Sequence, residues 1–191
     1  MNINKIKEKL EYMLTTKRYN HSISVAECAV EISHIYNQDE QEAYLAGLVH
    51  DCAKNLNKEQ VFSYVDKYNI ELDQFEINNI NLSHSTLGTY IAKYEFEIDN
   101  EDVLNSINSH TTGRANMSLL EKIIYMADLI EKNRSFPGVE ELRELVYNNK
   151  LDDALLKSLN NTIKIVIDRN QVIHPKTIEA RNYLIQNVSK L

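Results

Sequence analysis

The chain contains histidines and aspartates where a helical core would not normally place them. Four histidines and two aspartates lie on or beside stretches whose apolar residues recur with the helical period: His21, His50, Asp51, His84, His110 and Asp128. An ionised carboxylate taken out of water is costly unless a cation or several hydrogen-bond donors meet it. Imidazole and carboxylate groups are ligands of iron, manganese and zinc, so one shared metal site would explain the whole set. Each histidine, taken singly, is more simply explained as a hydrogen-bonded core or surface residue. The metal hypothesis therefore requires that the fold bring all six side chains together.

Four basic residues lie close in sequence to these candidate ligands: Arg18, Lys54, Arg114 and Arg134. Guanidinium and ammonium groups bind phosphate oxygens, so these residues are candidate phosphate ligands. Ordinary solvated charges are the competing interpretation. Thr111 either donates a hydrogen bond to phosphate or closes the end of a helix. The chain has no nucleophile elbow and no P-loop, so a metal-activated water is the expected nucleophile.

The elements that must position these residues are expected to be helices. The chain has four glycines and two prolines, whereas average usage predicts about 23 of the two together. Folds rich in tight turns need more of both, so the sequence predicts an all-α multi-helix bundle.

Apolar residues recur with the helical period over residues 25–36, 45–52, 87–94, 103–110, 118–128, 139–146 and 151–166. Asp99 or Asn100 is the expected N-cap of the fourth of these helices. Ser118 and Glu121 have the spacing of a capping box, and Thr177 is the expected cap of a last helix. The expected connections are residues 37–41, 69–83, 111–117, 133–138 and 170–177.

Length, charge and cysteine content narrow the class of protein. The 191 residues suit one domain. The net charge of −7 and the absence of a long basic run argue against nucleic acid as the main partner. The longest mostly apolar run, residues 43–49, is too short to span a bilayer. No secretion signal is evident, and the two cysteines form no disulfide framework, so we expect a cytoplasmic protein without membrane contact.

Joint motifs carry a resemblance to a known family. The order of the six candidate ligands resembles the metal-binding pattern of the HD-domain phosphohydrolases. More narrowly, the chain resembles the bacterial YqeK family in the segments RYNHS (18–22), HDCAK (50–54), HTTGR (110–114), NMSLLEKI (116–123) and NRSFPGVE (133–140). The similarity runs from about residue 10 to 185. It implies a single HD-type domain over residues 1–191, with residues 137–191 as a C-terminal helical extension packed on it.

The resemblance also implies a function: hydrolysis of diadenosine tetraphosphate to two ADP by a metal-activated water. By the same resemblance His21, His50, Asp51 and Asp128 would hold the principal metal, which the family suggests is iron. His84 and His110 would either ligate a second metal or contact phosphate.

The roles expected in the reaction divide into two groups. Asp51, Lys54, His84 and His110 are the expected catalytic residues. The expected substrate ligands are Arg18, Lys54, His84, His110, Thr111, Arg114 and Arg134. The partner is then a small nucleotide, and a second copy of the chain is a further candidate partner. The alternatives are another HD phosphohydrolase, such as a nucleoside monophosphate nucleotidase, and a noncatalytic nucleotide sensor.

Overall fold

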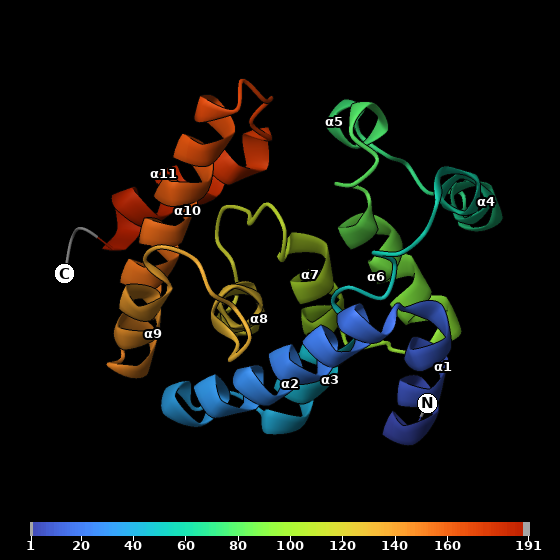
Figure 1. Cartoon of the computed structure of the whole chain (residues 1–191), viewed down its shortest axis with the longest axis horizontal. Helices are drawn as coiled ribbons and strands as arrows, with labels where there is room; N and C mark the ends of the chain where they lie inside the picture. Colours follow the sequence, from blue (N-terminus) through green and yellow to red (C-terminus); the bar gives the residue numbers. More distant parts are fainter. Residues whose placement is uncertain (1, 189–191) are drawn as a thin grey trace.

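The computed structural model describes residues 2–188, and these residues form helices and connections without a strand (Figure 1). The ends of the predicted domain, residues 1 and 189–191, lie outside this range. The helices are α1 (Ile3–Met13), α2 (Thr16–Tyr36), α3 (Glu40–Val49), α4 (Lys58–Tyr68), α5 (Gln74–Asn78), α6 (His84–Glu95), α7 (Glu101–Ser109), α8 (Leu119–Ile130), α9 (Val139–Tyr147), α10 (Leu151–Asp168) and α11 (Pro175–Val188). The predicted all-α single-domain bundle is confirmed.

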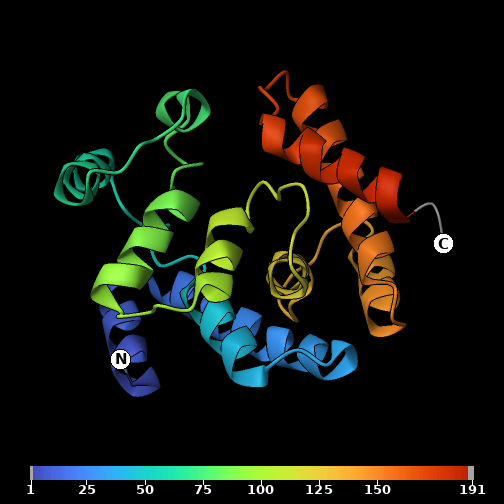
Figure 2. The same cartoon turned by 180° about the vertical axis from the view of Figure 1, so that it is seen from behind.

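Helix α8 is the centre of the bundle. It packs against α2, α3, α7, α9 and α10, and its residues Leu120, Ile123, Ile124 and Met126 are fully buried. Figures 1 and 2 show α10 and α11 on one side of α7 and α8, and α4, α5 and α6 on the other. Across residues 2–188, no helix combines the length and apolar character that crossing a bilayer requires.

The pair α2 and α3 packs unusually closely, and a glycine permits this. A Cβ at Gly47 would lie 2.8 Å from the Ala26 Cα and 3.0 Å from its amide nitrogen. Backbone atoms at that distance cannot yield to a side chain. Gly47 therefore brings the C-terminal end of α3 onto α2.

Helix ends explain how a chain with few glycines makes its turns. Left-handed backbone with φ between 49° and 59° occurs at Glu97 and at five asparagines, namely Asn37, Asn69, Asn116, Asn149 and Asn170. Asparagine tolerates this conformation better than most residues because its short side chain hydrogen-bonds locally. Two of the three predicted caps are also present: Asn100 caps α7, and Ser118 forms a capping box with Glu121 at the start of α8.

Some sequence predictions about elements are wrong. The predicted helices do not include α1, α4 or α5, and α5 lies inside the expected connection 69–83. A five-residue helix is too short to show a helical period, although Asp73 and Glu76 form a capping box at its start. The helix expected to reach Cys52 ends at Val49. Helix α11 begins at Pro175 rather than after Thr177, because proline suits the first helical turn, where no N–H is needed.

Candidate metal centre

The fold brings the six predicted ligands together around one point. His21 lies in the first turns of α2, His84 opens α6, Asp128 lies in α8, and His50 and His110 follow the last residues of α3 and α7. Ligand atoms lie within 4.8 Å of one another in three overlapping groups: His21, His50 and Asp51; His50, His110 and Asp128; Asp51, His84 and His110. We refer to these six residues as the metal centre.

Backbone carbonyls orient three of the four imidazole rings. Nδ1–H of His50, His84 and His110 donates to the carbonyl oxygen three residues earlier, over 2.6–2.7 Å. A carbonyl can only accept, so Nδ1 carries the proton and Nε2 keeps its lone pair. In each case Nε2 points toward Asp51, at 3.3–3.6 Å from a carboxylate oxygen. Fixing the second ring nitrogen in this way is typical of metal-binding histidines.

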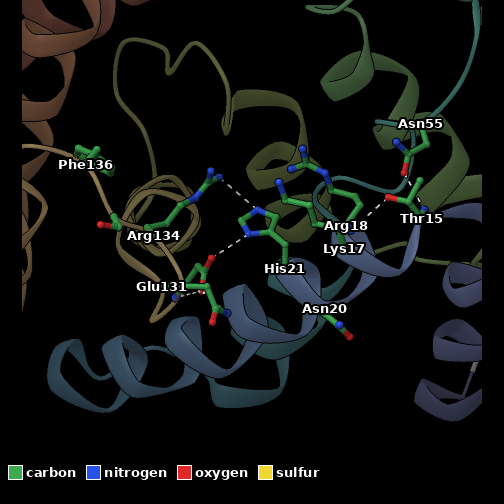
Figure 3. Close-up of a pocket in the computed structure, with 11 residues that line it drawn as sticks. Thr15, Lys17, Arg18, Asn20, His21, Asn55, Glu131, Arg134 and Phe136 are labelled. Atoms are coloured by element: carbon green, nitrogen blue, oxygen red, sulfur yellow. Dashed lines mark hydrogen bonds and ion pairs between the residues drawn. The ribbon is translucent and has the colours of Figure 1, made fainter.

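A carboxylate that the sequence analysis missed orients the fourth imidazole. Glu131 Oε1 lies 3.1 Å from Nδ1 of His21, whose Nε2 lies 2.9 Å from Asp128 Oδ1. The Glu131 carboxylate is 2% exposed, and its other oxygen accepts the backbone N–H of Asn133. Figure 3 shows His21 between Glu131 and Arg134. The only signal in the sequence was the three-residue spacing of Asp128 and Glu131, which places both on one side of a helix end.

Two arginines contact the two aspartates of the metal centre, of which Asp51 is buried and Asp128 is half-buried. Arg18 donates to Asp51 over 2.6 Å, and Arg134 donates to Asp128 over 2.5 Å. Burial alone would raise the pKa of the Asp51 carboxyl, but the imidazoles of His50, His110 and His84 bring it well below its usual range. Burial likewise opposes ionisation of Asp128, whereas its close contact with His21 and the positive charge of Arg134 lower its pKa. Both carboxylates are therefore ionised and able to act as ligands.

The donor set fits a divalent metal ion. Nε2 of His50 is buried and has no hydrogen-bond partner, while Asp51 Oδ2 and Asp128 Oδ1 lie 3.6 Å and 3.8 Å from it. Burial lowers the pKa of His50 to about 4, so its imidazole is neutral near pH 7, as metal binding requires. Burial also lowers the pKa of His84. Two carboxylates with several neutral imidazoles suit iron, manganese or zinc.

Lys54 lies beside His84, and Thr111 lies beside both His84 and His110. These are the two histidines that the sequence predicts either as metal ligands or as phosphate ligands. Nζ of Lys54 is 3.1 Å from Nε2 of His84, and burial lowers the pKa of this lysine. The Thr111 hydroxyl is 3.1 Å from Nε2 of both His84 and His110. Both side chains therefore reach the space in which a ligand of these histidines would lie.

Arg114 is the one predicted site residue that the fold does not bring to the centre. Its guanidinium donates two hydrogen bonds to the fully buried carboxylate of Glu121, over 2.6 Å and 2.5 Å. Glu121 also closes the capping box at the start of α8. The structure thus accounts for the charge of Arg114 through its ion pair, and a role in substrate binding stays a prediction.

Three cavities meet at the metal centre. The central cavity, of about 260 Å³, is lined by Arg18, Asp51, Lys54, His84, His110, Thr111, Tyr125, Asp128, Leu129, Arg134 and Thr162. On one side lies the cationic cleft, of about 730 Å³, lined by Thr15, Lys17, Arg18, Asn20, His21, Asn55, Glu131, Asn133, Arg134, Ser135 and Phe136 (Figure 3). It shares Arg18 and Arg134 with the central cavity.

The third cavity has the same volume, about 730 Å³, and we refer to it as the amide cavity. It is lined by Gln74, Phe75, Asn78, Asn79, Leu82, Thr111, Thr112, Thr162, Ile163, Val166, Asn170, Gln171, Val172, Ile173, His174 and Thr177. It shares Thr111 and Thr162 with the central cavity. The metal centre therefore lies between two larger spaces.

An all-helical bundle with a clustered His/Asp centre defines an HD-type metal-dependent hydrolase, and the comparison with known families agrees. The HD domain family matches residues 18–133, so the chain belongs to the HD-domain family, as the sequence resemblance implies. This membership implies that the centre binds a divalent metal.

Relatives with this fold cover nearly the whole chain. A symmetrical bis(5'-nucleosyl)-tetraphosphatase of Halalkalibacterium halodurans is 40% identical, with 97% of this chain and 98% of that protein covered. The protein of the same name from Bacillus subtilis is 35% identical, with 92% and 94% covered. A crystal structure from Clostridium acetobutylicum, described as a predicted HD superfamily hydrolase involved in NAD metabolism, superposes with a TM-score of 0.93. It is 50% identical and covers 97% of this chain and 98% of that one.

Proposed function

We propose that this enzyme hydrolyses dinucleoside tetraphosphates symmetrically, converting diadenosine tetraphosphate to two ADP. The observation that carries the proposal is the position of the metal centre between two cavities of equal volume. A substrate with a nucleoside at each end and its scissile bond in the middle suits that arrangement. The names of the relatives from H. halodurans and B. subtilis support the same activity.

The metal is proposed to be iron, with one or two ions bound. His21, His50, Asp51 and Asp128 would hold the principal ion, and the unpartnered Nε2 of His50 supports this assignment. His84 and His110 would either ligate a second ion or bind a phosphate oxygen. A bound divalent ion supplies charge neutralisation and lowers the pKa of water, which generates the nucleophile near neutral pH.

The chain's own residues bind and align the phosphates. The guanidinium groups of Arg18 and Arg134 now contact Asp51 and Asp128. When those carboxylates hold a cation, the same guanidinium groups are free to bind phosphate oxygens, which they match in geometry. Lys54 and Thr111 lie beside His84 and would donate to the phosphate on the other side of the scissile bond.

The bond changes follow from this arrangement. The water oxygen bonds to one of the two central phosphorus atoms, and the bond from that phosphorus to the central bridging oxygen breaks. The bridging oxygen leaves with the second ADP, and the water proton is released. Cations on either side of the scissile bond stabilise the charge that spreads over the phosphate oxygens.

Product chromatography with metal-loaded protein, purified without oxygen, tests the proposal. Diadenosine tetraphosphate should yield ADP alone, and Asp51→Asn protein should yield none. AMP with ATP would mean asymmetric cleavage and would contradict the proposal. Adenosine and phosphate from AMP would instead favour a nucleotidase. Dinucleotide binding by the metal-loaded protein without turnover would favour a noncatalytic sensor.

Three expectations about partners and location stay predictions from the sequence. They are a cytoplasmic location, a homodimer, and the lack of a nucleic-acid partner. The dispersed acidic charge supports the last of these, because nucleic-acid binding needs a continuous basic surface.

A further inference from the structure

The amide cavity differs from every other part of the site in its lack of fixed charge. None of its lining residues is Asp, Glu, Lys or Arg. Its polar groups are threonine hydroxyls, the imidazole of His174 and amide side chains, the last being Gln74, Asn78, Asn79, Asn170 and Gln171. Amides present donors and acceptors together without favouring a charged ligand.

An aromatic ring in this cavity is held in place by a buried histidine. The rings of Phe75 and His174 lie 5.0 Å apart at an interplanar angle of 50°. Nδ1 of His174 accepts the backbone N–H of Lys176, and its Nε2–H donates to Asp73 over 3.0 Å. These contacts join the connection before α11 to the start of α5. Figures 1 and 2 show the tip of the α10–α11 pair facing α5, with α7 between them and below.

The cavity also opens onto the metal centre. Thr111 and Thr162 line both the amide cavity and the central cavity. The Thr111 hydroxyl lies 3.1 Å from Nε2 of His84 and of His110. One ligand molecule can therefore place one of its ends in the amide cavity and a phosphate group at the metal centre.

We infer that the amide cavity binds one nucleoside of the substrate, base and ribose, while the attached phosphates pass Thr111 toward Arg18 and Arg134. This inference rests on the proposed function. A base is flat, uncharged and rich in hydrogen-bonding edges, so an aromatic ring and amide side chains match its face and its edges. The volume of about 730 Å³ lies in the usual range for small-molecule sites. A phosphate would find no cation here, whereas the cationic cleft offers Lys17, Arg18 and Arg134.

A substitution that fills the cavity tests this assignment. Val166 lines the amide cavity on α10, whereas its neighbour Ile165 is 48% exposed and lines none of the three cavities. Val166→Trp is the blocking variant and Ile165→Trp is its matched control. Binding of adenosine and of pyrophosphate to metal-loaded protein is measured by calorimetry, and turnover of diadenosine tetraphosphate is measured beside it.

We expect Val166→Trp to weaken adenosine binding about tenfold, since a lost base contact has an effect of this size. The KM for diadenosine tetraphosphate should rise similarly, with pyrophosphate affinity and metal content unchanged. Ile165→Trp should bind adenosine as the parental protein does. Phe75→Leu keeps an apolar side chain, removes the ring, and should weaken adenosine binding about fivefold.

The possible results distinguish a failure of the nucleoside assignment from a failure of the proposed function. If Val166→Trp and Ile165→Trp bind adenosine equally well, or if the parental protein does not bind it, the nucleoside assignment is wrong. If adenosine binding is lost only in Val166→Trp but the parental protein makes no ADP, the assignment stands and the proposed function fails.

Discussion

The cationic cleft and the amide cavity have equal volumes and adjoin the same metal centre, yet their chemistry is opposite. The cleft is lined by Lys17, Arg18, Arg134 and Glu131, and the cavity by uncharged side chains. A chain of net charge −7 repels polyphosphate as a whole, so the few cations must be local to the reacting phosphates. Under the proposed function, a symmetrical substrate would therefore have its two ends in unlike surroundings.

The two regions also come from different parts of the chain. The cleft is built from the start of α2 and the connection after α8, whereas the cavity is built from α5, the connection after α7, and the α10–α11 pair. Substitutions in one region should therefore leave the other intact.

The largest effect is expected for Asp51→Asn, because this carboxylate belongs to the metal centre that lies between the two regions. Three imidazoles point toward Asp51, and one of its carboxylate oxygens can ligate a metal ion. Turnover should fall at least about a thousandfold, as when a central metal ligand or catalytic group is removed. Metal analysis should show reduced metal retention, and circular dichroism should show an unchanged helical fold.

Asp153→Asn, at an exposed position of α10, is the matched control for Asp51→Asn and should keep parental activity. Near-parental activity in Asp51→Asn would remove this residue from the mechanism.

The substitution Arg134→Met should affect the cationic cleft and leave the amide cavity unchanged, so it tests most clearly whether the two regions act independently. Arg134 lines the cleft and the central cavity but not the amide cavity. We expect kcat/KM for diadenosine tetraphosphate to fall about a hundredfold, because a charge-assisted contact to the reacting phosphates is lost. Adenosine affinity should not change. Lys132→Met, which removes an exposed surface charge paired with Glu27, is the control. Equal losses of adenosine and pyrophosphate affinity would mean that the two regions are not independent.

Glu131→Gln should weaken metal binding on the cleft side of the centre. The Glu131 carboxylate accepts from Nδ1 of His21 and holds its ring in place. Loss of such an orienting partner typically weakens metal affinity about 10–100-fold. Titration with a competing chelator measures this affinity, and added metal should restore turnover. If metal affinity were parental, the Glu131–His21 contact would be structural only.

Arg114→Met should have the smallest effect on activity, because Arg114 belongs to neither region. Its removal leaves the buried Glu121 carboxylate without its bidentate partner. We expect the free energy of unfolding to fall by roughly 1–3 kcal/mol, with kcat/KM per folded molecule unchanged. Denaturant unfolding and steady-state kinetics check the two parts separately. A loss of kcat/KM without a loss of stability would restore Arg114 as a substrate ligand.

Local features were predictable where the physical signal is local. The capping box of Ser118 and Glu121 and the cap at Asn100 follow from three-residue spacings. The helical class follows from periodicity and from the scarcity of glycine and proline. Helix α5 escaped because five residues carry too little periodicity, and Glu131 escaped because its role depends on His21, 110 residues away.

The residue types of the metal centre, the helical class and the caps of α7 and α8 depend on side-chain chemistry and on neighbours within a few positions, so the sequence suffices to predict them. Tertiary structure alone decided that His21 and Asp128 lie 2.9 Å apart, that backbone carbonyls turn three Nε2 atoms inward, and that Arg114 pairs with Glu121. It also decided that one flanking space is charged and the other is not. Such contacts join residues from distant helices, and only the packing of the whole bundle around α8 brings them within hydrogen-bonding distance.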